Sequence, residues 1–223
     1  MTDRPLAVLW DMDGTLVDTE PYWIRAEHEL VAAHGGVWSD EMAHQLVGKA
    51  LEDSARMIID ATGIDLSPIE IINRLLDRVI EQVEEAVPWR PGAPELLAEL
   101  GALGVPNVLV TMSWRNLAEA VLRNLPEGSF SGLVTGDSVT HGKPHPEPYL
   151  TAAAGLGLEP GACIAIEDSP TGVRSATTAG VPTIAVPHIV PIPEIPGSVR
   201  IETLEGLLAS ELTDLVAEVW ALR

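Results

Sequence analysis

The chain has 223 residues, enough for one large domain or for a domain with a smaller insertion. It carries 13 basic and 33 acidic side chains, and this net charge of −20 argues against nucleic acids and anionic membranes as partners. The sequence lacks a run of about 20 apolar residues, the length of a membrane span, and its single cysteine has no partner for an internal disulfide. We therefore expect a cytoplasmic protein that is a monomer or a weak homodimer.

The first apolar run, Leu6 to Trp10, ends in two aspartates and a glycine: Asp11, Asp13 and Gly14. Side chains two residues apart on a strand share a face, so we expect both aspartates to point into one crevice. Two carboxylates 4 Å apart repel by roughly 4 kcal/mol at an effective dielectric of about 20, which favours a cation between them. The alternative interpretation is a strand followed by an ordinary Asp-Gly turn.

Residues 17–86 have a helical pattern and predict four helices. The first begins near Pro21 and ends at Gly35 and Gly36, and two shorter helices are expected over 40–46 and 51–61. The sequence Ser67-Pro68-Ile69-Glu70 is typical of a capping box and opens the long fourth helix. We expect these helices to form a domain inserted into the rest of the chain.

From residue 87 onward, helices alternate with short apolar strands. Helices are predicted over 94–103, 116–124, 147–154 and 171–179, and strands over 107–111, 133–134, 163–166 and 183–186. This alternation predicts a Rossmann-like α/β core with a parallel sheet and helices on both faces, built from residues 1–16 and 87–223. The proline-rich segment 187–197 is expected to be a surface loop. A C-terminal amphipathic helix is predicted from the apolar positions Leu212, Leu215, Val216, Val219 and Leu222.

Three later segments place further reactive side chains after strands or in a stiff loop. The strand that starts at residue 107 ends in Thr111 and Ser113, whose hydroxyls and neighbouring backbone N–H groups suit phosphate oxygens. Lys143 lies in a loop stiffened by prolines and supplies a fixed positive charge. The strand that starts at residue 163 ends in Glu167 and Asp168, which offer metal ligands; the alternative role of these two acids is to cap the following helix.

Together these four segments, in this order, resemble the four motifs of the haloacid dehalogenase (HAD) superfamily of phosphotransferases: DxDGT, a hydroxyl after a strand, a lysine and paired acids. The resemblance covers the whole chain. It implies that the helical insertion, residues 17–86, is a cap that closes over the site and selects small soluble substrates. It also implies that Mg²⁺ is the cofactor.

The resemblance assigns catalytic roles to two aspartates. Asp11 is the predicted nucleophile, because an ionised carboxylate can attack phosphorus and form an aspartyl phosphate. Asp13 is the predicted general acid and base. The resemblance implies Mg²⁺ ligands from the side chain of Asp11, the backbone carbonyl of Asp13 and the carboxylate of Asp168, with Glu167 binding directly or through a water.

Phosphate binding is expected from a second set of residues. These are Thr111, Met112, Ser113, Lys143 and, by analogy, the backbone N–H of Gly14. Substrate specificity is expected in the loop 47–50, which contains Lys49, and near Glu20, Trp23 and Trp114, although Trp23 has the alternative role of core packing. His141 and His145 flank Lys143, and as loop histidines we expect them to be solvated rather than metal-bound.

The predicted function is therefore a Mg²⁺-dependent phosphatase that hydrolyses a small phosphorylated metabolite. The segment 18–23 looks like that of hexose-phosphate phosphatases in the superfamily, which points to a sugar phosphate. The alternative is a sugar phosphomutase, but those mutases carry a lysine where this chain has Trp114 and Arg115. A non-catalytic protein that binds a phosphorylated metabolite is a third possibility, and the presence of both Asp11 and Asp13 argues against it.

Overall fold

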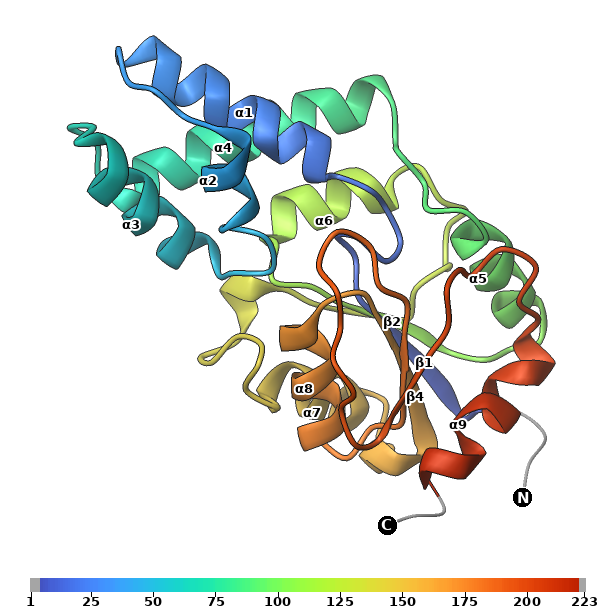
Figure 1. The fold of residues 1–223 in the computed structure, drawn as a ribbon. Helices are drawn as coiled ribbons and strands as arrows, with labels where there is room; N and C mark the ends of the chain where they lie inside the picture. The colour runs from blue at the N-terminus through green and yellow to red at the C-terminus, as the bar shows by residue number, and fades with distance from the viewer. Residues whose placement is uncertain (1–4, 221–223) are drawn as a thin grey trace.

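The structure is a computed structural model that describes residues 5–220, and its centre is a six-stranded parallel sheet (Figure 1). The strands are β1 (Ala7–Trp10), β2 (Asn107–Val110), β3 (Gly132–Val134), β4 (Cys163–Glu167), β5 (Thr183–Ala185) and β6 (Ser198–Arg200). Their order is β3-β2-β1-β4-β5-β6, so the chain first builds one side of β1 and then the other. Such a reversal opens a crevice at the carboxyl ends of the strands. The predicted Rossmann-like α/β sheet is confirmed.

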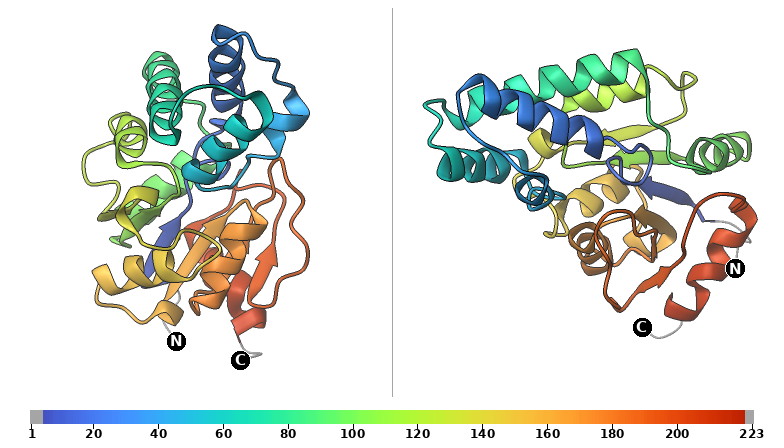
Figure 2. Two further views of the ribbon diagram at one scale, coloured as in Figure 1. Left: turned by 90° about the vertical axis from the view of Figure 1, so that its left-hand side faces the viewer. Right: turned by 45° about the horizontal axis from the view of Figure 1, so that its top comes forward.

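Helices cover both faces of the sheet, because successive strand residues point to opposite faces and both sets are apolar. Ala7 and Leu9 belong to a buried cluster with α7 and α8, whereas Val8 and Trp10 belong to a larger cluster with α5, α6 and α9. Figure 2 shows α7 and α8, yellow and orange, side by side on one face. These helices are α5 (Ala93–Ala102), α6 (Arg115–Leu122), α7 (Glu147–Gly155), α8 (Pro170–Thr178) and α9 (Leu212–Trp220).

Four further helices lie together at the carboxyl ends of the strands, above the sheet in Figure 1. They are α1 (Glu20–Ala33), α2 (Asp40–His44), α3 (Leu51–Thr62) and α4 (Pro68–Glu85). The predicted capping box opens α4, since Ser67 N donates to Glu70 Oε2 at 2.8 Å and Glu70 N donates to Ser67 Oγ at 3.4 Å. All four predicted helices are therefore present.

The chain enters and leaves these four helices through two adjacent connections. Asp18 N donates to the carbonyl of Pro88 at 2.8 Å, and Arg90 N donates to the carbonyl of Leu16 at 3.0 Å. Beyond this point the helices also pack on the rest of the molecule, because α4 lies along α6 and both contribute to one continuous apolar cluster. The four helices are thus held over the sheet by a paired connection and by a helix-helix contact.

The structure differs from the sequence prediction in a few elements. β6 was not predicted, because three residues without an alternating pattern give no strand signal. The proline-rich segment 187–197 forms neither helix nor strand, as expected, but Ile192 is buried against Val173 and Ala185 and anchors it. Leu222 lies outside the described residues. Within residues 5–220, none of the helices has the length and apolar character needed to span a bilayer.

Candidate active site

Asp11 lies directly after β1, at the carboxyl end of the sheet. Its backbone N–H donates to the carbonyl of Ile166 in the neighbouring strand at 3.0 Å. This hydrogen bond extends the strand pairing by one residue and fixes the backbone from which the Asp11 side chain projects. Asp11 is 7% exposed, and its Oδ1 accepts a 2.6 Å hydrogen bond from Lys143 Nζ. The other oxygen, Oδ2, is buried and has no hydrogen-bond partner among the described residues. A buried carboxylate oxygen without a partner is costly, and a bound cation would offset that cost.

Lys143 carries the buried positive charge that the sequence predicted. Its side chain is 4% exposed, and Nζ donates to Asp11 Oδ1 at 2.6 Å, to Glu167 Oε1 at 2.6 Å and to the carbonyl of Val110 at 2.8 Å. These three bonds use all three ammonium protons. Burial opposes the charge, but the two carboxylates outweigh it and raise the pKa of Lys143 above its ordinary value.

Glu167, the last residue of β4, is fully buried and saturated with hydrogen bonds. Oε1 accepts from Lys143 Nζ at 2.6 Å and from Tyr149 OH at 2.9 Å. Oε2 accepts from the backbone N–H groups of Asp168 at 3.1 Å and Ser169 at 3.2 Å, and from Ser169 Oγ at 3.1 Å. Glu167 is therefore the principal counter-ion of Lys143 together with Asp11.

Asp168 completes a group of three buried carboxylates. Asp11, Glu167 and Asp168 each present an oxygen within 4.8 Å of the others, yet Lys143 supplies the only ammonium group beside them among the described residues. Burial raises the pKa of Asp11 to about 7, with Glu167 adding to the effect and Lys143 opposing it. Burial, reinforced by Asp11, raises the pKa of Asp168 well above its usual range. A divalent cation would remove this excess of negative charge.

The alternative role of Glu167 and Asp168 as helix caps is wrong, because a neighbouring residue caps the helix. Ser169 is the N-cap of α8, and its Oγ accepts from Gly172 N at 3.0 Å. Gly172 itself lies so close to the Glu167 carboxylate that a Cβ there would overlap it. The first turn of α8 thus leaves room for the Glu167 carboxylate.

Asp13 is held by three hydroxyl groups rather than by strand geometry. β1 ends at Trp10, and Asp13 lies in a turn beyond it. Its carboxylate accepts from Thr19 Oγ1 at 2.5 Å, Ser113 Oγ at 2.7 Å and Thr111 Oγ1 at 3.2 Å. The two hydroxyls expected to bind phosphate therefore bind Asp13 in this structure.

The backbone N–H of Gly14 is used within the turn and not for phosphate. Its backbone N–H, expected to bind phosphate, donates to the carbonyl of Val17 at 2.7 Å within the turn. The residue has φ +90°, which favours glycine, and a Cβ there would overlap the carboxylate of Asp168. Gly14 thus allows the turn and leaves room for Asp168.

A crevice of about 100 Å³ lies between the four helices and the carboxyl ends of the strands. It brings together most of the expected site residues: Asp11, Asp13, Gly14, Glu20, Trp23, Lys49, Thr111, Met112, Ser113, Lys143 and Asp168. Trp23 lines the crevice and also packs against the core. Trp114 and Glu167 are not among the described residues that line it.

The part of the crevice formed by α1 is acidic. Glu20 and Glu27 both line it, and the indole N–H of Trp38 donates to Glu27 Oε2 at 2.9 Å. Burial, together with Glu27, Asp13 and Asp18, raises the pKa of Glu20 to about 8, and burial raises that of Glu27 to about 7 against the Trp38 hydrogen bond. This side of the crevice therefore presents carboxyl groups that hold a proton near neutral pH and can both donate and accept hydrogen bonds.

Sequence reasoning missed several residues of the site, Glu27 among them. Thr19 and Tyr149 bind Asp13 and Glu167 through their hydroxyls, but no pattern in the sequence distinguishes them from ordinary helix-flanking and helix-core residues. His188 and Ile189 line the crevice from the loop after β5, and His188 Nε2 lies 2.9 Å from Asp18 Oδ1. The adjacency of His188 to a predicted strand end was the one signal available.

The comparisons with known proteins agree with this geometry. The sequence profile of the haloacid dehalogenase-like hydrolases matches residues 8–186. Hexitol phosphatase B of Escherichia coli K12 is 34% identical, over 96% of this chain and 95% of that protein. N-acetylmuramic acid 6-phosphate phosphatase of Pseudomonas aeruginosa is 38% identical, over 82% of each chain. The crystal structure of CbbY from Rhodobacter sphaeroides in complex with phosphate superimposes with a TM-score of 0.84 at 27% identity, covering 91% of this chain and 96% of that one. The chain therefore belongs to the haloacid dehalogenase-like hydrolases.

Proposed function

We propose that the protein is a Mg²⁺-dependent phosphatase that hydrolyses a small phosphate monoester through an aspartyl-phosphate intermediate. The observation that carries the proposal is the environment of Asp11. One of its oxygens is fixed by Lys143 at 2.6 Å, and the other is buried without a hydrogen-bond partner among the described residues. A carboxylate held in this way at the floor of a crevice is oriented for attack on phosphorus.

The metal would be held by Asp11, Asp168 and the backbone carbonyl of Asp13. The donor set of hard oxygens suits Mg²⁺, and the partnerless Asp11 Oδ2 and the surplus of negative charge fit a cation at this place. Bound there, the ion would neutralise charge on the carboxylates and on the phosphate. Glu167 accepts five hydrogen bonds from protein groups, so we assign it to Lys143 and not to direct metal binding.

Asp11 and Asp13 would divide the chemistry. Asp13 must enter the first step protonated. A bond forms between an Asp11 oxygen and phosphorus while the ester bond to the leaving oxygen breaks, and Asp13 gives its proton to that oxygen. Asp13 then takes a proton from a water that attacks phosphorus, which releases inorganic phosphate and restores Asp11. The hydroxyl of Thr19 would hold the Asp13 side chain in position for both steps, and those of Thr111 and Ser113 would do so until they turn to donate to the phosphate.

Phosphate oxygens would be bound at the edge formed by Thr111, Met112, Ser113 and Lys143, all of which line the crevice. The three ammonium protons of Lys143 are all donated to protein oxygens in this structure. Contact between Lys143 and a phosphate therefore requires the exchange of one of these partners. The charge of the lysine stabilises the developing negative charge in either arrangement.

Residues 17–86 would act as a cap on a catalytic core made of residues 1–16 and 87–223. Lys49, Glu20 and Trp23 line the crevice from the cap side, where substrate identity would be read. The names of the two relatives point to a phosphorylated sugar or sugar alcohol. The acidic wall made by Glu20 and Glu27 supports a substrate whose second end carries hydroxyls.

The test is phosphate release from a panel of sugar, polyol and small-acid phosphates, with and without Mg²⁺, using Asp11→Asn as the control. We expect metal-dependent release from a few esters and none from the variant. Release that is unaffected by Asp11→Asn would overturn the nucleophile assignment. Absence of release, followed by conversion of a hexose 1-phosphate in the presence of a bisphosphate primer, would identify a phosphomutase. Binding of these esters without turnover would identify a non-catalytic protein.

We also propose a cytoplasmic location and a monomeric or weakly dimeric state. Cys163 is buried and unpaired, which is compatible with a reducing compartment. Sedimentation velocity over a range of protein concentrations tests the oligomeric state.

A further inference from the structure

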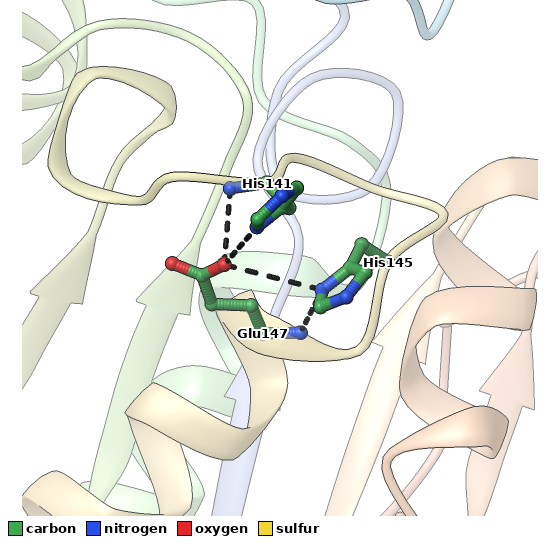
Figure 3. A group of neighbouring side chains, drawn as sticks. All are labelled: His141, His145 and Glu147. Carbon is green, nitrogen blue, oxygen red and sulfur yellow. Dashed lines mark hydrogen bonds and ion pairs between the residues drawn. The ribbon is translucent and has the colours of Figure 1, made fainter.

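A second group of side chains of metal-binding types lies in and beside the loop that carries Lys143 (Figure 3). His141 and His145 come from the loop on either side of Lys143, and Glu147 is the first residue of α7. The two imidazole side chains are 62% and 51% exposed and the Glu147 side chain is 28% exposed. The sequence placed the histidines in a solvated loop, but it gave no reason to join Glu147 to them.

The three side chains converge on one carboxylate oxygen. His141 Nδ1 lies 2.9 Å and His145 Nδ1 lies 4.0 Å from Glu147 Oε2, and one ligand atom from each residue lies within 4.8 Å of the other two. The two imidazole rings have their centroids 4.6 Å apart. Four-coordinate Zn²⁺ with bonds of about 2.0–2.2 Å needs ligand atoms roughly 3.4 Å apart, so small rotations of exposed rings suffice.

Glu147 is already held in place as an ionised group. Its Oε1 accepts from Thr140 N at 2.7 Å and its Oε2 accepts from His141 N at 3.0 Å. The backbone hydrogen bond from Thr140 and the side chain of His141 hold the pKa of Glu147 below its ordinary value. The carboxylate is therefore fixed by the loop before any ion binds, which reduces the entropy lost on binding.

The histidine His145 presents a lone pair in the same region. Its Nδ1 accepts a hydrogen bond from Glu147 N at 3.2 Å, and in this arrangement the nitrogen presents the lone pair that a metal ligand needs. The N–H that an ion would displace belongs to the first turn of α7, where water can take over as its partner.

We propose that His141, His145 and Glu147 form a binding site for a transition-metal dication such as Zn²⁺, separate from the Asp11 and Asp168 site. Two imidazole nitrogens and one carboxylate favour Zn²⁺, Ni²⁺ or Cu²⁺ over Mg²⁺, which prefers oxygen ligands. The ion would tie together the two sides of the loop around Lys143. Its binding would therefore stabilise the loop that positions this lysine.

The test is equilibrium dialysis against Zn²⁺ with metal analysis of the protein, in a background of Asp168→Ala that weakens the other site. We compare this protein with one that also carries His141→Gln and His145→Gln, and with a matched control that carries His44→Gln, since His44 is another exposed histidine. We expect one Zn²⁺ per chain in the Asp168→Ala protein and in the His44→Gln control, and its loss from the double histidine variant.

Thermal denaturation of the same proteins gives a second readout. Zn²⁺ should raise the Tm of the Asp168→Ala protein and leave that of the double histidine variant unchanged, because only a ligand that binds the folded state stabilises it. Circular dichroism without added metal confirms that all variants are folded. Equal Zn²⁺ binding by the double histidine variant, or no binding by the Asp168→Ala protein, would overturn the proposal. Neither result depends on phosphatase activity.

Discussion

Lys143 Nζ lies 2.6 Å from Asp11 Oδ1, although the two residues are 132 positions apart in the chain. The parallel sheet creates this contact, because it brings the residue after β1 and the loop before α7 to the same edge. The charge of the lysine is shared with Glu167, so it cannot balance all the carboxylates around it. This excess of carboxylates over the one ammonium group beside them within residues 5–220 should affect both the stability of the protein and its affinity for a metal ion.

Replacement of Lys143 by methionine should reduce both stability and activity. It leaves Asp11 and Glu167 buried without their cation, and loss of one partner of a buried ion pair costs about 3–5 kcal/mol. Urea denaturation measures the free energy of unfolding, and phosphate release measures activity. Lys49→Met is the matched control, because Lys49 is exposed and its replacement should change stability by less than about 0.5 kcal/mol. Equal stabilities of the two variants would contradict the role given to the buried pair.

Replacement of Asp168 by asparagine and of Glu167 by glutamine should affect different properties, the Mg²⁺ requirement in the first case and the Tm in the second. Asp168→Asn should raise the Mg²⁺ concentration needed for half-maximal activity by about tenfold or more, because it weakens a proposed ligand. Glu167→Gln should mainly lower the Tm. The NH2 group of the glutamine would take the place of an oxygen that accepts from Lys143 or from Ser169, and that hydrogen bond would be lost. Mg²⁺ titrations of both variants measure the difference. A shift as large for Glu167→Gln as for Asp168→Asn would make Glu167 a ligand.

Asp13→Asn should lower kcat by about 10²–10⁴-fold with little change in stability. The amide oxygen can accept from Thr19 on one side or from Thr111 and Ser113 on the other, and the hydroxyl groups that face its NH2 can turn to accept from it, but the amide cannot transfer the proton. Steady-state kinetics on the best ester of the panel, with the Tm as a folding control, measures the effect. Unchanged kcat would exclude Asp13 as the general acid and base.

Glu27 should make folding less favourable as the pH rises. Its pKa is raised by burial from 4.5 to about 7 in the folded protein, so between these values the folded state holds a proton that the unfolded state has lost. The contribution of Glu27 to the free energy of unfolding is therefore most favourable below about pH 4.5 and declines, by an amount on the order of 3 kcal/mol, up to about pH 7.

Glu27→Gln removes this titration and keeps an acceptor for Trp38. We expect the variant to gain stability relative to the native protein as the pH rises from 5 to 7.5, measured by denaturant unfolding at each pH. Because Glu20 has a raised pKa as well, part of the native pH dependence should remain in the variant. A constant difference between the two proteins over this range would show that Glu27 is ionised in the folded state.

Gly172→Ala should destabilise the protein by about 1–3 kcal/mol, because the added Cβ overlaps the buried carboxylate of Glu167. Gly155→Ala is the matched control. Gly155 is also in a helix. Apart from that helix's backbone and the two chain neighbours, no atom of the described residues lies within 4 Å of a Cβ added at Gly155. Alanine has a higher helix propensity than glycine, so this substitution should stabilise the helix. Thermal unfolding should therefore show opposite changes, and a Gly172→Ala protein as stable as the native one would indicate that Glu167 can move.

Local patterns made several elements of the fold predictable. The capping box at Ser67 and the alternation of helices with apolar strands are local signals, and they placed α4 and the strands β1 to β5 to within a few residues. Asp11, Asp13, Lys143 and Asp168 were found because each stands at a strand end or in a stiff loop. The structure shows that these residues line one crevice.

The partners of these residues could not be predicted, because they depend on tertiary packing. Tyr149 belongs to the buried face of α7, and only the fold reveals that its hydroxyl reaches Glu167. Thr111 and Ser113 were assigned to phosphate from their position, whereas the turn after β1 brings Asp13 within reach of their hydroxyls. A hydrogen bond across 100 residues has no signature in a single sequence.

The two connections to the four helices are hydrogen-bonded to each other, Leu16 with Arg90 and Asp18 with Pro88. The chain leaves the sheet and returns to it at the same place, so the seventy or so residues between these points do not fix the path of any strand. A helical segment of another length or shape can be exchanged there while the six strands keep their order. Because we propose that these helices read the substrate, substrate choice would evolve in this one stretch of the sequence while the proposed chemistry is retained in the rest.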